Sequence, residues 1–79
     1  MTEEPAERTL DLKGLLCPIP VVKLSQAVKT VDVGSVIEAV ATDPGVLVDI
    51  PAWCRSTGNE LLTMERAAGT VTFRVRRVR

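Results

Sequence analysis

The spacing of apolar residues changes along this chain between the period of a strand and the period of a helix, and this alternation limits the possible folds most. Apolar and polar residues alternate over Arg8–Leu12, which predicts a short strand. Val21, Leu24 and Val28 then follow at the i, i+3 and i+7 spacing of one helix face, which predicts a helix over Pro18–Lys29. The chain therefore opens with a strand followed by a helix.

The next segments repeat that order. Ser35–Thr42 is apolar on both faces apart from Glu38, a pattern that favours an interior strand over an edge strand. Helical spacing resumes over Val46–Gly58 and ends at a glycine, the usual residue of a helix C-terminus. Pro51 interrupts this helix, so we expect either a kink there or a new start with Asp49 as N-cap.

Two alternating runs close the chain, Glu60–Arg66 and Thr70–Val78, and Gly69 between them predicts a β-hairpin. The order is β-α-β-α-β-β in 79 residues, which is the length of one domain. We expect two helices on one face of a small mixed four-stranded sheet, an α/β (α+β) fold. Residues 8–79 form this domain, and residues 1–7 are predicted to be a flexible acidic tail.

Composition excludes several kinds of chemistry. The sequence has no histidine and two cysteines, so neither a Ser-His-Asp triad nor a zinc site of histidines or four thiolates can form within it. Ten basic residues balance ten acidic ones, which argues against a nucleic-acid binder. The N-terminus has no basic and apolar signal pattern, and the longest apolar stretch is too short to cross a membrane. We expect a cytoplasmic protein with reduced thiols and no membrane association.

Cys17 is the candidate for chemistry, because it stands directly before a helix whose first turn contains Pro18 and Pro20. The positive end of the helix dipole lowers the pKa of a thiol placed there, while the prolines stiffen the turn. The apolar neighbours Leu16 and Ile19 oppose this by desolvation. We predict an accessible, partly activated nucleophile with a thiol pKa below the free-cysteine value of about 8.5.

The CPxP segment Cys17–Pro20, after a strand that leads into the LDxxG run Leu10–Gly14, resembles the signature of the TusA family of small sulfur-carrier proteins. Thr42–Gly45, Asp49–Pro51 and Gly58–Leu61 also resemble that family. The likeness covers roughly residues 9–77, and the order of elements is the family's own. The resemblance implies a two-layer sandwich in which Cys17 is catalytic.

By the same resemblance, Cys17 accepts a persulfide sulfur from a donor such as a cysteine desulfurase or a rhodanese and relays it to an acceptor thiol. Asp11, Gly14, Pro18 and Pro20 are the supporting motif. The protein would be a sulfurtransferase and a monomer. It would need no metal or organic cofactor, because the donor enzyme cleaves the C–S bond. The alternative is a non-catalytic regulatory or protein-interaction module of the same fold.

The remaining candidate residues have simpler interpretations. Cys54 follows Trp53 on the inward side of the second helix, and we interpret both as core residues. Asp11 either orients the loop after the first strand or caps the first helix. Asp43 and Asp49 precede or approach prolines and are interpreted as turn and cap residues.

The arginine-rich end of the chain suggests RNA binding at first sight. Arg74 and Arg76 fall on one face of the last predicted strand, opposite Phe73 and Val75. Basic residues on the solvent face of an edge strand protect against aggregation, and we interpret them in this way. We expect no direct contact with nucleic acid.

Overall fold

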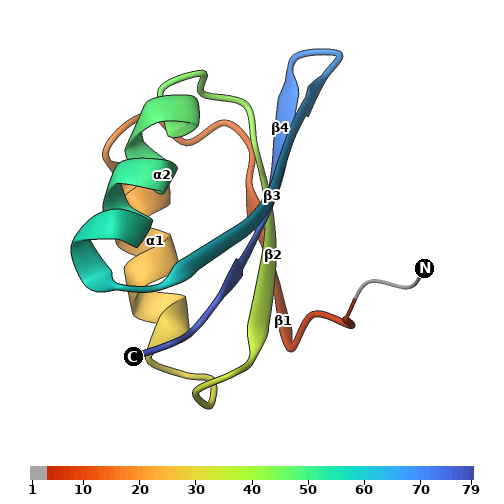
Figure 1. The fold of residues 1–79 in the computed structure, drawn as a ribbon. Helices are drawn as coiled ribbons and strands as arrows, with labels where there is room; N and C mark the ends of the chain where they lie inside the picture. The colour runs from red at the N-terminus through yellow and green to blue at the C-terminus, as the bar shows by residue number, and fades with distance from the viewer. Residues whose placement is uncertain (1–3) are drawn as a thin grey trace.

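The computed structural model describes residues 4–79, and its elements follow the order predicted from the sequence (Figure 1). They are β1 (Arg8–Leu12), α1 (Ile19–Val28), β2 (Val36–Ala41), α2 (Val46–Thr57), β3 (Glu60–Ala67) and β4 (Thr70–Arg76). Both helices lie on the same side of the sheet, so the two-layer fold is confirmed. The predicted flexible tail lies partly outside the described residues, and its flexibility stays a prediction.

The sheet is mixed and has the strand order β1-β2-β4-β3. β1 pairs with β2 in parallel, whereas β4 pairs antiparallel with both β2 and β3. The interior position predicted for β2 is confirmed. The edge position predicted for β4 is wrong, because β3 folds back along its outer side and becomes the edge strand itself. Alternation within one strand sets which side chains share a face, but it does not set the order of strands.

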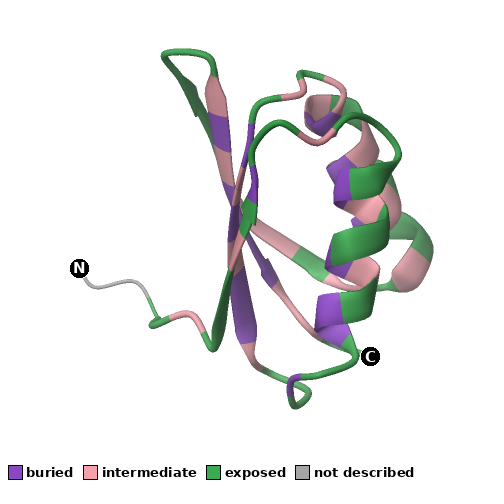
Figure 2. Ribbon diagram, turned by 180° about the vertical axis from the view of Figure 1, so that it is seen from behind, coloured by how far each residue is buried: buried purple, intermediate pink, exposed green. Residues whose placement is uncertain are grey.

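The hydrophobic core lies between the sheet and the helices. Figure 2 shows the buried segments on the helix sides that face the sheet. Phe73 and Val75 of β4 are fully buried there, opposite Leu24 of α1 and Ile50 of α2. Burial of such side chains stabilises a domain by roughly 1.5–3 kcal/mol each. This packing fixes both helices on the sheet and therefore fixes where their N-termini lie.

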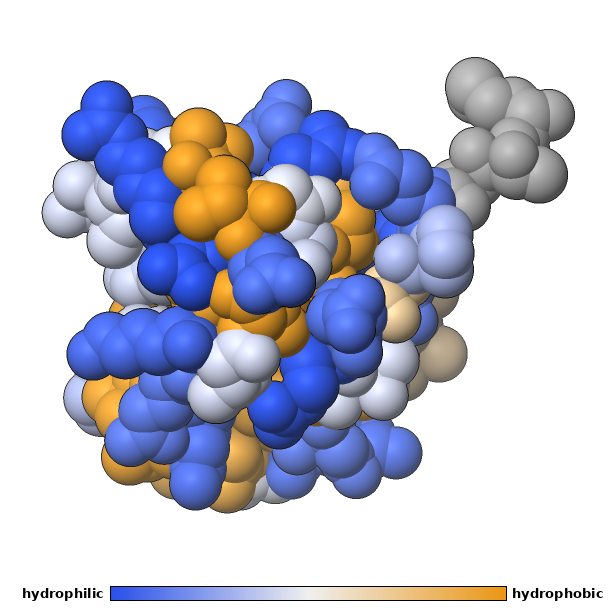
Figure 3. Space-filling model, turned by 90° about the horizontal axis from the view of Figure 1, so that it is seen from below, coloured by the Kyte–Doolittle hydropathy of each residue, from blue (hydrophilic) through white to orange (hydrophobic). Residues whose placement is uncertain are grey.

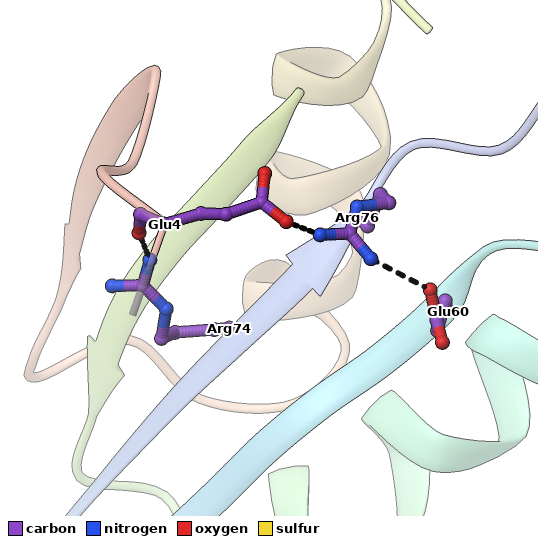
Figure 4. Close-up of polar contacts among 4 residues, drawn as sticks. All are labelled: Glu4, Glu60, Arg74 and Arg76. Atoms are coloured by element: carbon purple, nitrogen blue, oxygen red, sulfur yellow. Dashed lines mark hydrogen bonds and ion pairs between the residues drawn. The ribbon is translucent and has the colours of Figure 1, made fainter. Parts of the chain in front are cut away.

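The outer face of the sheet carries charged side chains (Figure 4). The Arg74 guanidinium donates to Glu38 at 2.7 Å, and Arg76 pairs with Glu60 at 3.2 Å. Glu4 lies across both arginines, with its carbonyl oxygen at Arg74 and its carboxylate at Arg76. Both arginines therefore form ion pairs with acidic residues of the same chain, and they do so from an interior strand.

Helix α2 is continuous through Pro51. Its first turn is closed by Gly45, whose carbonyl accepts the N–H groups of Val48 at 3.1 Å and Asp49 at 2.9 Å. The predicted restart with Asp49 as N-cap is therefore wrong, and Asp49 lies in the first turn instead. Gly58 ends the helix in the left-handed region with φ of 79°, as expected for its residue type. Within residues 4–79, neither helix is long and apolar enough to cross a bilayer.

Candidate functional site

The candidate site lies where the two parallel strands end. Leu12, the last residue of β1, is in register with Ala41, the last residue of β2. The loops that follow them therefore leave the same edge of the sheet side by side. They are joined by a hydrogen bond from the N–H of Gly14 to Oγ1 of Thr42 at 2.8 Å. In an open α/β sheet, the carboxyl ends of parallel strands are where functional groups commonly gather.

The loop after β1 is shaped by two members of the predicted supporting motif. Oδ1 of Asp11 accepts the N–H of Lys13 at 3.1 Å, which tightens the turn. Gly14 follows with φ of +81°, a conformation that a side chain would strain. Asp11 thus orients the loop and does not cap α1, which has Pro18 at its N-cap and no side-chain cap.

Asp43 connects the two loops at Cys17. Its Oδ2 accepts the backbone N–H of Cys17 at 2.8 Å, and its Oδ1 accepts the N–H of Gly45 at 3.3 Å. The predicted role of Asp43 in its turn is therefore confirmed. The same carboxylate also holds the backbone of Cys17, 26 residues away along the chain.

The Cys17 side chain is exposed and points to the first turn of α2. Its Sγ donates a hydrogen bond to Oδ2 of Asp49 at 2.8 Å. The thiol is therefore accessible to a reactant, and its proton is held by a carboxylate. A second helix supplies this carboxylate, so the site depends on how α1 and α2 pack together.

The predicted lowering of the Cys17 pKa is wrong. The hydrogen bond to Asp49 raises the pKa of Cys17, and desolvation and the negative charges of Asp49 and Asp43 raise it further. The expected stabilisation of a thiolate rested on the positive end of the helix dipole, which the free N–H groups in the first turn of α1 carry. One of these, the N–H of Ile19, donates instead to the carbonyl of Leu16 at 2.9 Å. The hydrogen bond to Asp49 and the two negative charges therefore favour the neutral thiol of Cys17 over its thiolate.

The two prolines of the motif differ in burial and therefore in role. Pro18 is exposed at the N-cap of α1, beside the thiol. Pro20 is fully buried and packs in the core. Only Pro18 faces the surface on which a reactant approaches, whereas Pro20 anchors the start of the helix.

A shallow groove of about 430 Å³ opens beside the thiol between α1 and α2. It is lined by Cys17, Pro18, Val21, Asp49, Ala52, Trp53 and Ser56. Trp53, predicted to be a core residue, is half-buried: it packs against the core and also lines this groove. Cys54, in contrast, is 4% exposed within the core, and burial raises its thiol pKa. The structural interpretation of Cys54 agrees with this burial.

The sequence analysis missed Asp49 as a partner of Cys17. Its place before Ile50 and Pro51 indicated a local cap, and no spacing links it to a thiol 32 residues earlier. The sequence did contain one indication that Asp49 lies near the groove. Its spacing of three, four and seven residues from Ala52, Trp53 and Ser56 places all four on one face of α2. Among residues 4–79, no group of three or more metal-ligating side chains lies together.

The fold and the site together define a small α/β sandwich with one exposed thiol at the start of its first helix. The sequence model of the family described as Sulfurtransferase TusA matches residues 8–77. The sulfur carrier protein TusA of Pseudomonas putida strain GB-1 is 39% identical over 77 residues, which covers 98% of this chain and 96% of that protein. The chain belongs to the TusA family of sulfur carrier proteins.

Two further relatives differ in what they support. A protein of Aquifex aeolicus is 44% identical over 63 residues, which is 80% of this chain but 32% of that protein, so this chain spans about a third of its length. The crystal structure of a SirA-like protein from Desulfitobacterium hafniense superposes with a TM-score of 0.73, covering 91% of this chain and 99% of that one. At 21% identity, this likeness supports the fold alone.

Proposed function

We propose that this protein relays sulfur as a persulfide on Cys17. The observation that supports this most is the contrast between its two thiols: Cys17 is exposed at the family's CPxP segment, and Cys54 is buried in the core. Of the two thiols, Cys17 alone is open to a second protein. The proposed donor is a cysteine desulfurase or a rhodanese-type enzyme, and the proposed acceptor is a protein thiol, all in the cytoplasm.

The proposed reaction is two successive exchanges. The Cys17 thiolate attacks the outer sulfur of the donor's persulfide, the donor's S–S bond breaks, and the donor thiolate leaves and takes up the proton lost by Cys17. The acceptor thiolate then attacks the outer sulfur on Cys17 in the same way. One sulfur atom moves in each exchange and no net oxidation occurs. The protein acts in this sense as a sulfurtransferase, with no cofactor required of it.

The proposed supporting residues hold the backbone and the sulfur of Cys17 in position. Asp11 and Gly14 shape the loop that presents the thiol, and Asp43 holds its backbone. Pro18 keeps the start of α1 rigid beside the sulfur, and Pro20 fixes that start to the core. Orientation of the attacking sulfur is what such residues contribute.

Intact-mass analysis after incubation with a cysteine desulfurase and cysteine tests this function. We expect the wild-type protein and Cys54→Ser to gain one sulfur atom and Cys17→Ser to gain none. If neither a cysteine desulfurase with cysteine nor a rhodanese with thiosulfate loads the wild-type protein, the relay is refuted, and the alternative of a non-catalytic interaction module is favoured. If Cys54→Ser loads but cannot pass sulfur on, Cys54 takes part in the relay.

A further inference from the structure

Among residues 4–79, six large apolar side chains are exposed, and three of them lie around Cys17. Leu16 is 71% exposed, Ile19 is 41% exposed and Val48 is 71% exposed, and each is adjacent in sequence to a groove residue. Val48 precedes Ala52 and Ser56 of the groove by one and two helical turns, so it extends the same wall. We call Leu16, Ile19, Val48 and the groove residues the thiol rim.

The opposite end of the molecule differs from the thiol rim. Figure 3 shows the end that bears the C-terminus and the loop between α1 and β2. Its surface is largely hydrophilic with an apolar patch, and Val33 and Val78 of these two segments are 64% and 45% exposed. The thiol rim differs because its exposed apolar side chains border a groove, and exposed apolar area of this kind commonly marks a site of interaction with another molecule.

The charge inside the thiol rim indicates what that molecule must carry. The charges that act on Cys17 are those of Asp49 and Asp43, and both are negative. Asp49 accepts a hydrogen bond from the Cys17 thiol, with Sγ and Oδ2 2.8 Å apart, so its carboxylate favours the unreactive thiol and disfavours the thiolate. A cation brought next to Asp49 would compete for that carboxylate and favour ionisation of Cys17.

We propose that the thiol rim docks a protein whose reactive cysteine lies beside a lysine or arginine on an apolar surface, and that Asp49 binds this cation. The identification of that protein as a persulfide donor rests on the proposed function. The cation draws the Asp49 carboxylate away from Sγ of Cys17. Cys17 then ionises next to the outer sulfur of the donor's persulfide. Asp49 is then a specificity-determining residue. It keeps Cys17 protonated and unreactive until a partner with a suitably placed cation binds.

Stable disulfides of different charge test this recognition without a partner protein, because they undergo the same attack by Cys17. Cystamine carries an ammonium group on each arm, and 2-hydroxyethyl disulfide is neutral. The measured quantity is the ratio of the two rates of mixed-disulfide formation at Cys17, followed by intact mass. Comparing this ratio between variants removes the intrinsic difference in reactivity between the two reagents.

We expect the ratio to fall by about 1.4-fold to fivefold in Asp49→Asn, the range for an exposed charge pair. Asp49→Glu, which keeps the charge, should retain most of the preference for cystamine. The matched control is Asp32→Asn, an exposed acid in the loop between α1 and β2, which should leave the ratio unchanged. Far-UV circular dichroism confirms that each variant is folded.

An equal ratio in the wild-type protein and in folded Asp49→Asn would overturn this proposal. The reagents contain no transferable persulfide sulfur, so the result is independent of the relay. If a desulfurase loads Cys17 but Asp49→Asn leaves the ratio unchanged, the docking proposal alone fails. If the ratio falls but no desulfurase or rhodanese loads Cys17, the proposed function fails, and with it the persulfide donor as the partner.

Discussion

Replacing Cys54 by serine puts a hydroxyl into the apolar layer between α2 and the sheet. Cys54 is 4% exposed and lies on the buried face of α2 with Val46 and Ile50. A buried hydroxyl without a partner costs roughly 1–3 kcal/mol. Part of this is recovered if the serine bonds to the carbonyl one turn earlier, as Thr57 does to Trp53 at 2.8 Å. We expect a net loss of about 1–2 kcal/mol.

Urea unfolding followed by far-UV circular dichroism measures this loss. For a domain of this size, each kcal/mol lowers Tm by roughly 4–8 °C, so thermal unfolding gives a second readout. Cys54→Ala is the matched control, because it removes the sulfur without adding a polar group, and it should be more stable than Cys54→Ser. Cys17→Ser should leave the unfolding midpoint unchanged. A serine variant at position 54 as stable as the wild-type protein would refute the burial argument.

Three further predictions follow from individual contacts. Asp49→Asn replaces the carboxylate whose hydrogen bond and negative charge raise the pKa of Cys17, so the rate of iodoacetamide alkylation against pH should shift to lower pH; an unshifted or upward-shifted profile contradicts this. Pro20→Ala removes buried ring carbons and should lower the free energy of unfolding by about 1–2 kcal/mol, and no loss would show that the ring does not pack. Glu60→Gln removes the charge that pairs with Arg76 at 3.2 Å and should cost about 0.5 kcal/mol in urea unfolding, and less at high salt; a salt-independent cost would contradict the electrostatic origin.

Local patterns predicted the elements of this fold because each one depends on residues close in the sequence. The helical stripe of α1 and the stop at Gly58 agree with the structure within a residue or two. The strand order was harder to predict for β4. Its alternation is the same in an edge or an interior strand, and its interior position depends on pairing with both β2 and β3.

In the candidate site too, features set by nearby residues were predicted correctly, and features set by contacts between distant segments were not. The exposure of Cys17 and the burial of Cys54 follow from their places relative to helix faces, and both agree with the prediction. The pKa of Cys17 does not follow from such local rules. The largest contribution to its rise is the hydrogen bond to Asp49, which the packing of α2 against α1 brings to the sulfur. Desolvation and the charges of Asp49 and Asp43 raise the pKa further, and Asp43 and Asp49 both come from segments distant in sequence.

The site of sulfur attachment in the wild-type protein tests the central claim most directly. After loading by a desulfurase with cysteine, blocking with iodoacetamide and digestion with trypsin, the two cysteines fall in separate peptides, residues 14–23 and residues 30–55. We predict one added sulfur atom on the peptide that contains Cys17 and none on the peptide that contains Cys54. Added sulfur on the Cys54 peptide, or on neither peptide, would contradict a relay through Cys17.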